Sequence, residues 1–129
     1  MRNALRVSPE LDDARAKRIG QNEAVFRRAN EVVRERAEQV GRTSRVPFIC
    51  ECGDDKCFAR VELSLGEYEA VRRDGSHFFV KRGHELTGPN LGRVYESLGE
   101  YTVLEKVGIA GGVAQEQDPR RAEREEAPS

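Results

Sequence analysis

The chain has 129 residues, of which 35% are charged and 37% are hydrophobic, and its formal net charge is −1. This length favours one domain with an appendage. The near balance of charges excludes a non-specific coat for DNA, which would need a strong basic field. There is no apolar run long enough to cross a bilayer and no signal-peptide pattern at the start, so we expect a cytoplasmic protein with no membrane association.

Charge and apolar content divide the chain into three parts. Residues 1–45 carry eleven basic and seven acidic side chains, and residues 46–108 carry eight basic and eleven acidic ones with nearly all the aromatic residues. Residues 109–129 contain almost no large apolar side chain. We therefore expect a helical arm over 1–45, a compact module over 46–108 and a mostly disordered tail over 109–129.

The arm is predicted to be one long amphipathic helix from about Asp12 to Val40. At helical spacing its apolar side chains fall within about 140° of arc; they are Ile19, Val25, Phe26, Ala29, Val32, Val33, Ala37 and Val40. The opposite side is predicted to be a charged solvent face with Glu23, Arg27, Arg28, Glu31, Arg34, Glu35 and Glu38. Ser8 or Asp12 could cap the start, and Gly41 suits the end.

This helix would be about 40 Å long, more than a small module can cover. The apolar stripe could pack on its own module, or part of it could meet another chain. Asn22, Asn30 and Arg36 lie in or beside the stripe. Buried polar groups usually find internal partners, so we expect them to hydrogen-bond to loops of the module, with contacts to a partner as the alternative.

The module is predicted to alternate short strands with short helices. Strand-like patterns cover residues 46–49, 59–63, 77–81 and 101–107, with a short pairing piece at 113–114. Ser64 and Glu67 form a capping-box pattern that predicts a helix to about Arg73, and a second short helix could span Leu91 to Leu98. The expected fold class is α+β, with a long N-terminal helix followed by a small, mostly antiparallel sheet and short helices.

Three cysteines lie within eight residues; they are Cys50, Cys52 and Cys57. An odd number argues against a disulfide framework, and clustered thiols in a reducing compartment are more often metal ligands. The single residue between Cys50 and Cys52 requires a bend, which Gly53 makes easier. We predict one structural Zn²⁺ that staples the module, with Lys56 and Arg60 placed to offset its thiolate charge.

Structural zinc needs a fourth ligand, and the chain has two histidines. His84 follows Gly83 in a predicted loop that can bend to meet a metal, whereas His77 begins an apolar strand. We favour His84 over His77, and Asp54 and Asp55 are weaker candidates because oxygen is less usual in a thiolate-rich site. A closed site of four protein ligands implies no hydrolytic chemistry, and the alternatives to zinc are redox-active thiols or inert packing.

Several segments are distinctive together, namely Arg18, Asn22-Glu23-Ala24-x-Phe26-Arg27, Asn30-Glu31, Phe48-Ile-Cys-Glu-Cys52, Cys57, residues 60–72, Phe79-Val80, Gly83-His84-Glu85, residues 103–108 and Asp118-Pro119-Arg120. This pattern resembles a family of small, largely uncharacterised actinobacterial proteins and covers most of residues 18–120. The resemblance implies a cytosolic protein in which Cys50, Cys52, Cys57 and His84 recur together as zinc ligands. It implies no known activity.

The sequence contains no catalytic motif: it has no P-loop, no GxSxG and no dinucleotide fingerprint. We therefore expect a zinc-binding interaction or regulatory module that docks a protein partner, and not an enzyme. The alternatives are a nucleic-acid-binding zinc protein or a thiol redox sensor that loses zinc on oxidation. The first alternative would use the Arg-rich segments 15–18, 27–28, 42–45 and 81–82. The partner and the oligomeric state stay open at this point.

Overall fold

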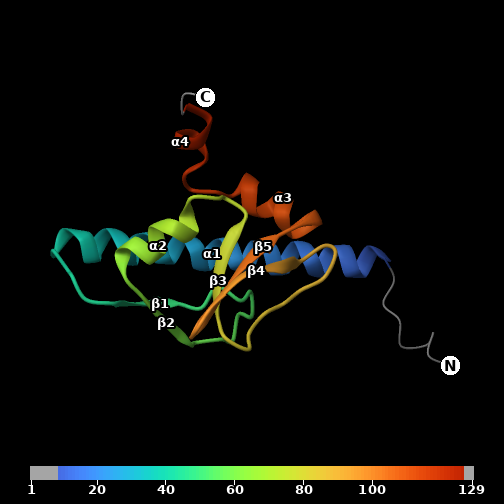
Figure 1. The fold of residues 1–129 in the computed structure, drawn as a ribbon. Coiled ribbons are helices and arrows are strands. Elements are labelled where there is room, and N and C mark those ends of the chain that lie inside the picture. Colours follow the sequence, from blue (N-terminus) through green and yellow to red (C-terminus); the bar gives the residue numbers. More distant parts are fainter. Residues whose placement is uncertain (1–8, 127–129) are drawn as a thin grey trace.

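The structure is a computed structural model that describes residues 9–126. It has the predicted α+β fold, with a long N-terminal helix, two small antiparallel sheets and several short helices. Helix α1 (Pro9–Gln39) runs along the whole molecule, and the strands lie across it (Figure 1). Ser8, one of the two expected caps, lies outside the described residues. Within residues 9–126, no helix combines the length and the apolarity that a membrane span requires.

The strands form two sheets where the sequence predicted one. Strands β1 (Val46–Ile49) and β2 (Arg60–Leu63) pair in the first sheet. Strands β3 (His77–Lys81), β4 (Gly92–Leu98) and β5 (Tyr101–Lys106) form the second, in the order β3-β5-β4. The segment for which we predicted a second short helix is therefore β4. The reason is pairing with β5 on both sides of a bulge at Tyr95, which overrides the weak local preference of these residues.

Helix α2 (Leu65–Arg72) begins where the capping box predicted. The Glu67 backbone N–H donates to Ser64 Oγ at 3.0 Å, and the Ser64 N–H donates to the Glu67 carboxylate at 2.8 Å. The helix places Tyr68 in the core, where its ring stacks on Phe48 with 4.4 Å between centroids. The ring of Phe79 on β3 meets both of these rings edge-on. This aromatic cluster joins the two sheets to α2.

The predicted apolar stripe of α1 is not the face that is buried. Ile19 and Ala37 are buried, but Val25, Val32 and Val40 are 56%, 66% and 59% exposed. The buried side instead contains polar residues that the sequence placed in solvent, above all Glu23 and Arg27, each only 1% exposed. Hydrophobic periodicity missed this face because its polar side chains find partners inside the fold.

Two of these buried groups illustrate the partners that they find. Glu23 pairs with the ammonium group of Lys106 on β5, and burial raises the pKa of Glu23 to about 7 despite that pair. Arg27 donates to the backbone oxygens of Gly75 at 2.7 Å and Ala114 at 2.6 Å, and its guanidinium lies over the Phe78 ring.

The expected disorder after residue 109 is wrong for the described part of the tail. Helices α3 (Gly108–Glu116) and α4 (Arg121–Glu126) follow β5, and α3 packs against α1. The strand piece expected at Val113-Ala114 lies inside α3. Small residues explain the packing, because a Cβ on Gly20 of α1 would stand only 3.2 Å from the Val113 side chain. A low content of large apolar residues thus permits close helix packing here.

Candidate metal centre

The four predicted metal ligands come from two loops. Cys50 directly follows β1, and Cys52 and Cys57 lie in the connection to β2; we call residues 50–57 the cysteine loop. The loop closes on itself, since the Cys50 N–H donates to the Ala59 oxygen at 3.1 Å and the Cys57 N–H to the Asp54 oxygen at 3.0 Å. His84 lies in the loop after β3.

Gly53 makes the sharp bend after Cys52, as predicted, with a φ of +85°. A Cβ at this position would also lie 2.9 Å from the Ile19 side chain, because α1 packs directly on the bend. Asn22 of α1 donates to the Gly53 oxygen at 3.1 Å. Helix α1 therefore fixes the backbone between Cys52 and Cys57, and both the positive φ and the close approach require glycine.

The ligand atoms of Cys50, Cys52, Cys57 and His84 all lie within 4.8 Å of one another and could bind one metal ion. His84 Nδ1 is 3.7 Å from Cys50 Sγ and 3.5 Å from Cys57 Sγ. Around a tetrahedral zinc, with bonds of about 2.3 Å to sulfur and about 2.0–2.1 Å to nitrogen, such atoms lie about 3.5 Å apart. The donor set and its spacing thus fit a zinc ion.

The loop after β3 turns His84 towards the cysteines. Gly83 has a φ of +94°, and the His84 N–H donates to the Lys81 oxygen at 2.9 Å, which closes the turn. The Lys81 N–H in turn donates to Cys50 Sγ at 3.2 Å. Such an N–H···S bond stabilises a thiolate, and it also joins the end of β3 to the first cysteine.

His77 is at the opposite end of β3 and does not face the cysteines. Its Nε2 lies 3.3 Å from Glu105 Oε2, and its ring packs against Tyr95. Asp54 and Asp55, the weaker candidates, are exposed, and Asp54 Oδ1 accepts the Lys56 N–H within the cysteine loop. Of the four candidates for the fourth ligand, only His84 belongs to the cluster.

The thiols influence each other even in the protein alone. A hydrogen bond from Cys50 lowers the pKa of Cys52 to about 5, while the same bond and burial raise the pKa of Cys50 far above its usual value. Lys56 and Arg60, expected to offset thiolate charge, are both exposed, and Arg60 donates to the Phe58 oxygen at 3.1 Å. Backbone N–H groups, among them that of Lys81, donate to the sulfurs of the cluster instead.

Glu51, between the first two cysteines, is a residue whose role the sequence did not indicate. It is fully buried, and its carboxylate accepts hydrogen bonds from Arg72 at 2.7 and 3.0 Å, from Asn30 at 2.8 Å and from the Phe79 N–H at 3.2 Å. These partners belong to α2, α1 and β3. Glu51 therefore anchors the cysteine loop to three elements. In the sequence, only the polar Asn30 in or beside the apolar stripe indicated such a buried polar contact.

Of the three polar residues flagged in the arm, two have the expected internal contacts. Asn22 binds the cysteine loop, and Asn30 also accepts the Ile49 N–H at 2.8 Å. Arg36 is exposed. In the Arg-rich segments, Arg27 is buried and is not available to a phosphate backbone, whereas Arg45 is half-exposed and pairs with Glu67 at 3.0 Å.

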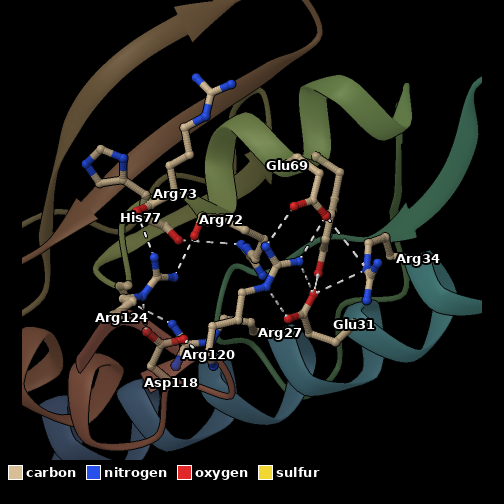
Figure 2. A network of polar contacts seen from close by, with 12 residues as sticks. Arg27, Glu31, Arg34, Glu69, Arg72, Arg73, His77, Asp118, Arg120 and Arg124 are labelled. Carbon is tan, nitrogen blue, oxygen red and sulfur yellow. Dashed lines mark hydrogen bonds and ion pairs between the residues drawn. The ribbon is translucent and has the colours of Figure 1, made fainter. Parts of the chain in front are cut away.

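The tail also anchors the fold through arginine pairs (Figure 2). Arg120 binds Glu31 of α1, with Nε 2.7 Å from the carboxylate, and Glu69 of α2 at 2.8 and 2.9 Å. Arg124 donates to the backbone oxygens of Arg72 and Arg73 at the end of α2.

Comparisons with family models, curated proteins and solved structures find no match to this chain, so the resemblance to an actinobacterial family stays a prediction.

Proposed function

We propose that this protein is a non-catalytic, zinc-binding interaction module that docks a protein partner through the outward face of α1. The zinc part rests on the Cys50, Cys52, Cys57 and His84 cluster, which supplies all four ligands of a structural site and leaves no coordination position for water. A metal held in this way stabilises the fold and does not act on a substrate.

The observation that carries the docking part is the exposure of valines on one face of α1. Val25, Val32 and Val40 are more than half exposed, and helical spacing places Val25, Ala29 and Val32 on the same side. We call these three residues the outer stripe. The opposite face of the helix is already used by the module, because Ile19, Arg27 and Asn30 are buried there. An apolar stripe without an internal role suits the apolar face of a partner helix.

A protein partner accounts for this stripe better than a nucleic acid does. Nucleic-acid binding depends mainly on cations that meet phosphates, and an apolar stripe contributes nothing to that interaction. The charges beside the stripe are also mixed in sign, since Arg28 and Arg36 alternate with Glu35. The rim of a protein interface commonly has this composition.

The test places a photoreactive benzoylphenylalanine at position 32 in the native host and identifies the crosslinked protein. Binding of that purified partner is then measured for two variants of this protein. One is the double variant Val25→Gln/Val32→Gln, in which glutamine keeps the helix propensity, and the other is the matched control Glu35→Gln. We expect the valine double variant to weaken binding by about tenfold or more, because two buried valines contribute more than about 1.4 kcal/mol. Equal affinities for both variants would refute docking on this face, and so would a crosslinked nucleic acid.

A further inference from the structure

A second group of metal-ligating side chains lies at the start of β3, at the other end of the strand from the cysteine cluster. His77 and Glu105 face each other in the β3–β5 register, and Asp74 precedes the strand. His77 Nε2 is 3.3 Å from Glu105 Oε2 and 3.6 Å from Asp74 Oδ2. The three donor atoms all lie within 4.8 Å of one another.

Each carboxylate is held by one oxygen and turns the other towards His77. Asp74 Oδ1 accepts the Ser76 N–H at 2.8 Å and the Ser76 hydroxyl at 2.7 Å. Glu105 Oε1 accepts two hydrogen bonds from Arg93, at 2.8 and 2.5 Å. The Tyr95 ring, 4.2 Å from the imidazole between centroids, fixes the plane of His77. Metal ligands are typically oriented in this way by outer hydrogen bonds.

The donor atoms stand at the spacing of ligands of one metal ion, and His77 Nε2 also lies within hydrogen-bond reach of Glu105 Oε2. Charge-assisted hydrogen bonds between nitrogen and a carboxylate are about 2.7–2.9 Å long, as Arg93 and Glu105 illustrate here. Both contacts of His77 Nε2 are longer, at 3.3 and 3.6 Å. Nitrogen and oxygen ligands of one tetrahedral zinc, with bonds of about 2.0–2.2 Å, lie about 3.4 Å apart. The spacing is that of two ligands on either side of an ion.

We propose that Asp74, His77 and Glu105 form a second metal site, which binds a divalent ion of the zinc class through one nitrogen and two oxygens. The two carboxylates carry two negative charges; Arg93 offsets the charge of Glu105, and Arg124 near Asp74 is itself paired with Asp118. Three protein ligands leave a coordination position for water, unlike the cysteine cluster. Half of the Asp74 side chain is exposed, so an ion reaches this site from solvent.

The proposal is independent of the proposed function, because it uses none of the cysteine-cluster ligands and none of the outer stripe. The test titrates Co²⁺ into the purified, zinc-loaded protein after dialysis against metal-free buffer. Zinc in the thiolate-rich cluster resists exchange with cobalt, so added Co²⁺ reports the second site. Binding is followed by calorimetry and by paramagnetic broadening of the NMR signals of Tyr95 and His77.

The variants are His77→Gln and Asp74→Asn, and the matched control is Glu96→Gln, an exposed carboxylate on the neighbouring β4. We expect one saturable equivalent of Co²⁺ in the wild type and in the control. In both site variants we expect an affinity lower by about 100-fold, since even loss of an outer partner costs about 10–100-fold. Thermal melting checks each fold, and Asp74→Asn removes only a partly exposed charge. The proposal is overturned if the wild type shows no saturable Co²⁺ binding, or if both site variants keep the wild-type affinity for Co²⁺.

Discussion

Among single residues, Glu51 connects more of the molecule than any of the cysteines around it. Its carboxylate joins Arg72 of α2, Asn30 of α1 and the backbone of β3, and neither Glu51 nor Arg72 is accessible to solvent. A buried ion pair contributes little in comparison with apolar packing, but removal of one partner leaves an uncompensated charge. Glu51, the second residue of the cysteine loop, therefore fixes the loop to the rest of the fold although it is not a metal ligand.

We predict that Glu51→Ala destabilises the protein by about 3–5 kcal/mol, because Arg72 then stays buried without a partner. Adding Arg72→Met should recover part of this loss, since both charges are then absent. The control Glu62→Ala, on the exposed side of β2, should change the free energy of unfolding by less than about 0.5 kcal/mol. Urea unfolding of the four proteins measures these values. Equal costs for Glu51→Ala and Glu62→Ala would show that the network has no energetic role.

The second prediction at this scale concerns the two histidines. His84→Ala should leave three thiolates, lower zinc affinity by orders of magnitude and lower the melting temperature in parallel, because metal binding and folding are coupled. His84→Cys should largely restore both, since thiolate suits zinc equally well. His77→Ala should keep the zinc of the cysteine cluster and cost about 1 kcal/mol. Zinc competition with a chromophoric chelator, combined with thermal melting, distinguishes these outcomes.

The opposite result would contradict the ligand assignment. If His77→Ala removed the zinc while His84→Ala kept it, the position of His84 in the cluster would have no functional meaning. Retention by both variants would point to an acidic residue or water as fourth ligand, and hydrolytic chemistry at the metal would then need to be considered again.

At the scale of elements, prediction succeeded where the signal was local. The capping box at Ser64 and Glu67 predicted the start of α2, and the strand-like segment at residues 101–107 predicted β5. Prediction failed where pairing with a distant segment determines the structure: Val94 and Glu96 are strand residues because β5 pairs with them. The same holds for the candidate metal site: its four ligands could be predicted, because the cysteine spacing and the loop position of His84 are visible in the sequence. Glu51 and the buried face of α1 are not, since both depend on contacts between distant segments.

Helix α4 and the turn before it provide the next prediction. A chain that ends at Gln117 loses Arg120, which bridges Glu31 and Glu69, and Arg124, which binds Asp118 and the end of α2 (Figure 2). We predict that this truncation lowers the melting temperature by several degrees. A wholly disordered tail would be removed without loss, and unchanged melting would therefore contradict the contacts in Figure 2.

Point variants separate this effect from a general effect of shortening the chain. Arg120→Ala should account for much of the loss, because its guanidinium is 18% exposed and serves two carboxylates. Arg121→Ala is the matched control, since Arg121 makes an exposed pair with Glu125 on the same short helix. Exposed pairs of this kind contribute little to stability, because solvent screens them. Calorimetry of the truncated and point-variant proteins measures both contributions.

At the scale of the whole molecule, the cysteine cluster and α1 belong to one cooperative unit. Helix α1 contacts the cysteine loop through Asn22 and Asn30, and the Cys50–His84 segment contains β2, α2 and β3. A structural zinc site has an apparent binding free energy of about 10–16 kcal/mol, which is as large as the usual stability of a domain, about 5–15 kcal/mol. Loss of the metal should therefore affect elements far from the ligands.

We predict that the purified protein holds one zinc ion per chain in the cysteine cluster, and that a strong chelator unfolds the protein under reducing conditions. Helical circular dichroism should fall together with zinc release, because α1 supplies most of the helix and its buried face includes charged and polar side chains. That face, with Glu23, Arg27 and Asn30, is stable only while its partners in the module stay in place. Metal analysis, a zinc-sensitive dye and circular dichroism, recorded on one sample, follow both processes. Release of zinc with an unchanged helical signal would show that α1 folds independently of the metal, and a protein purified without stoichiometric zinc would contradict the metal site itself.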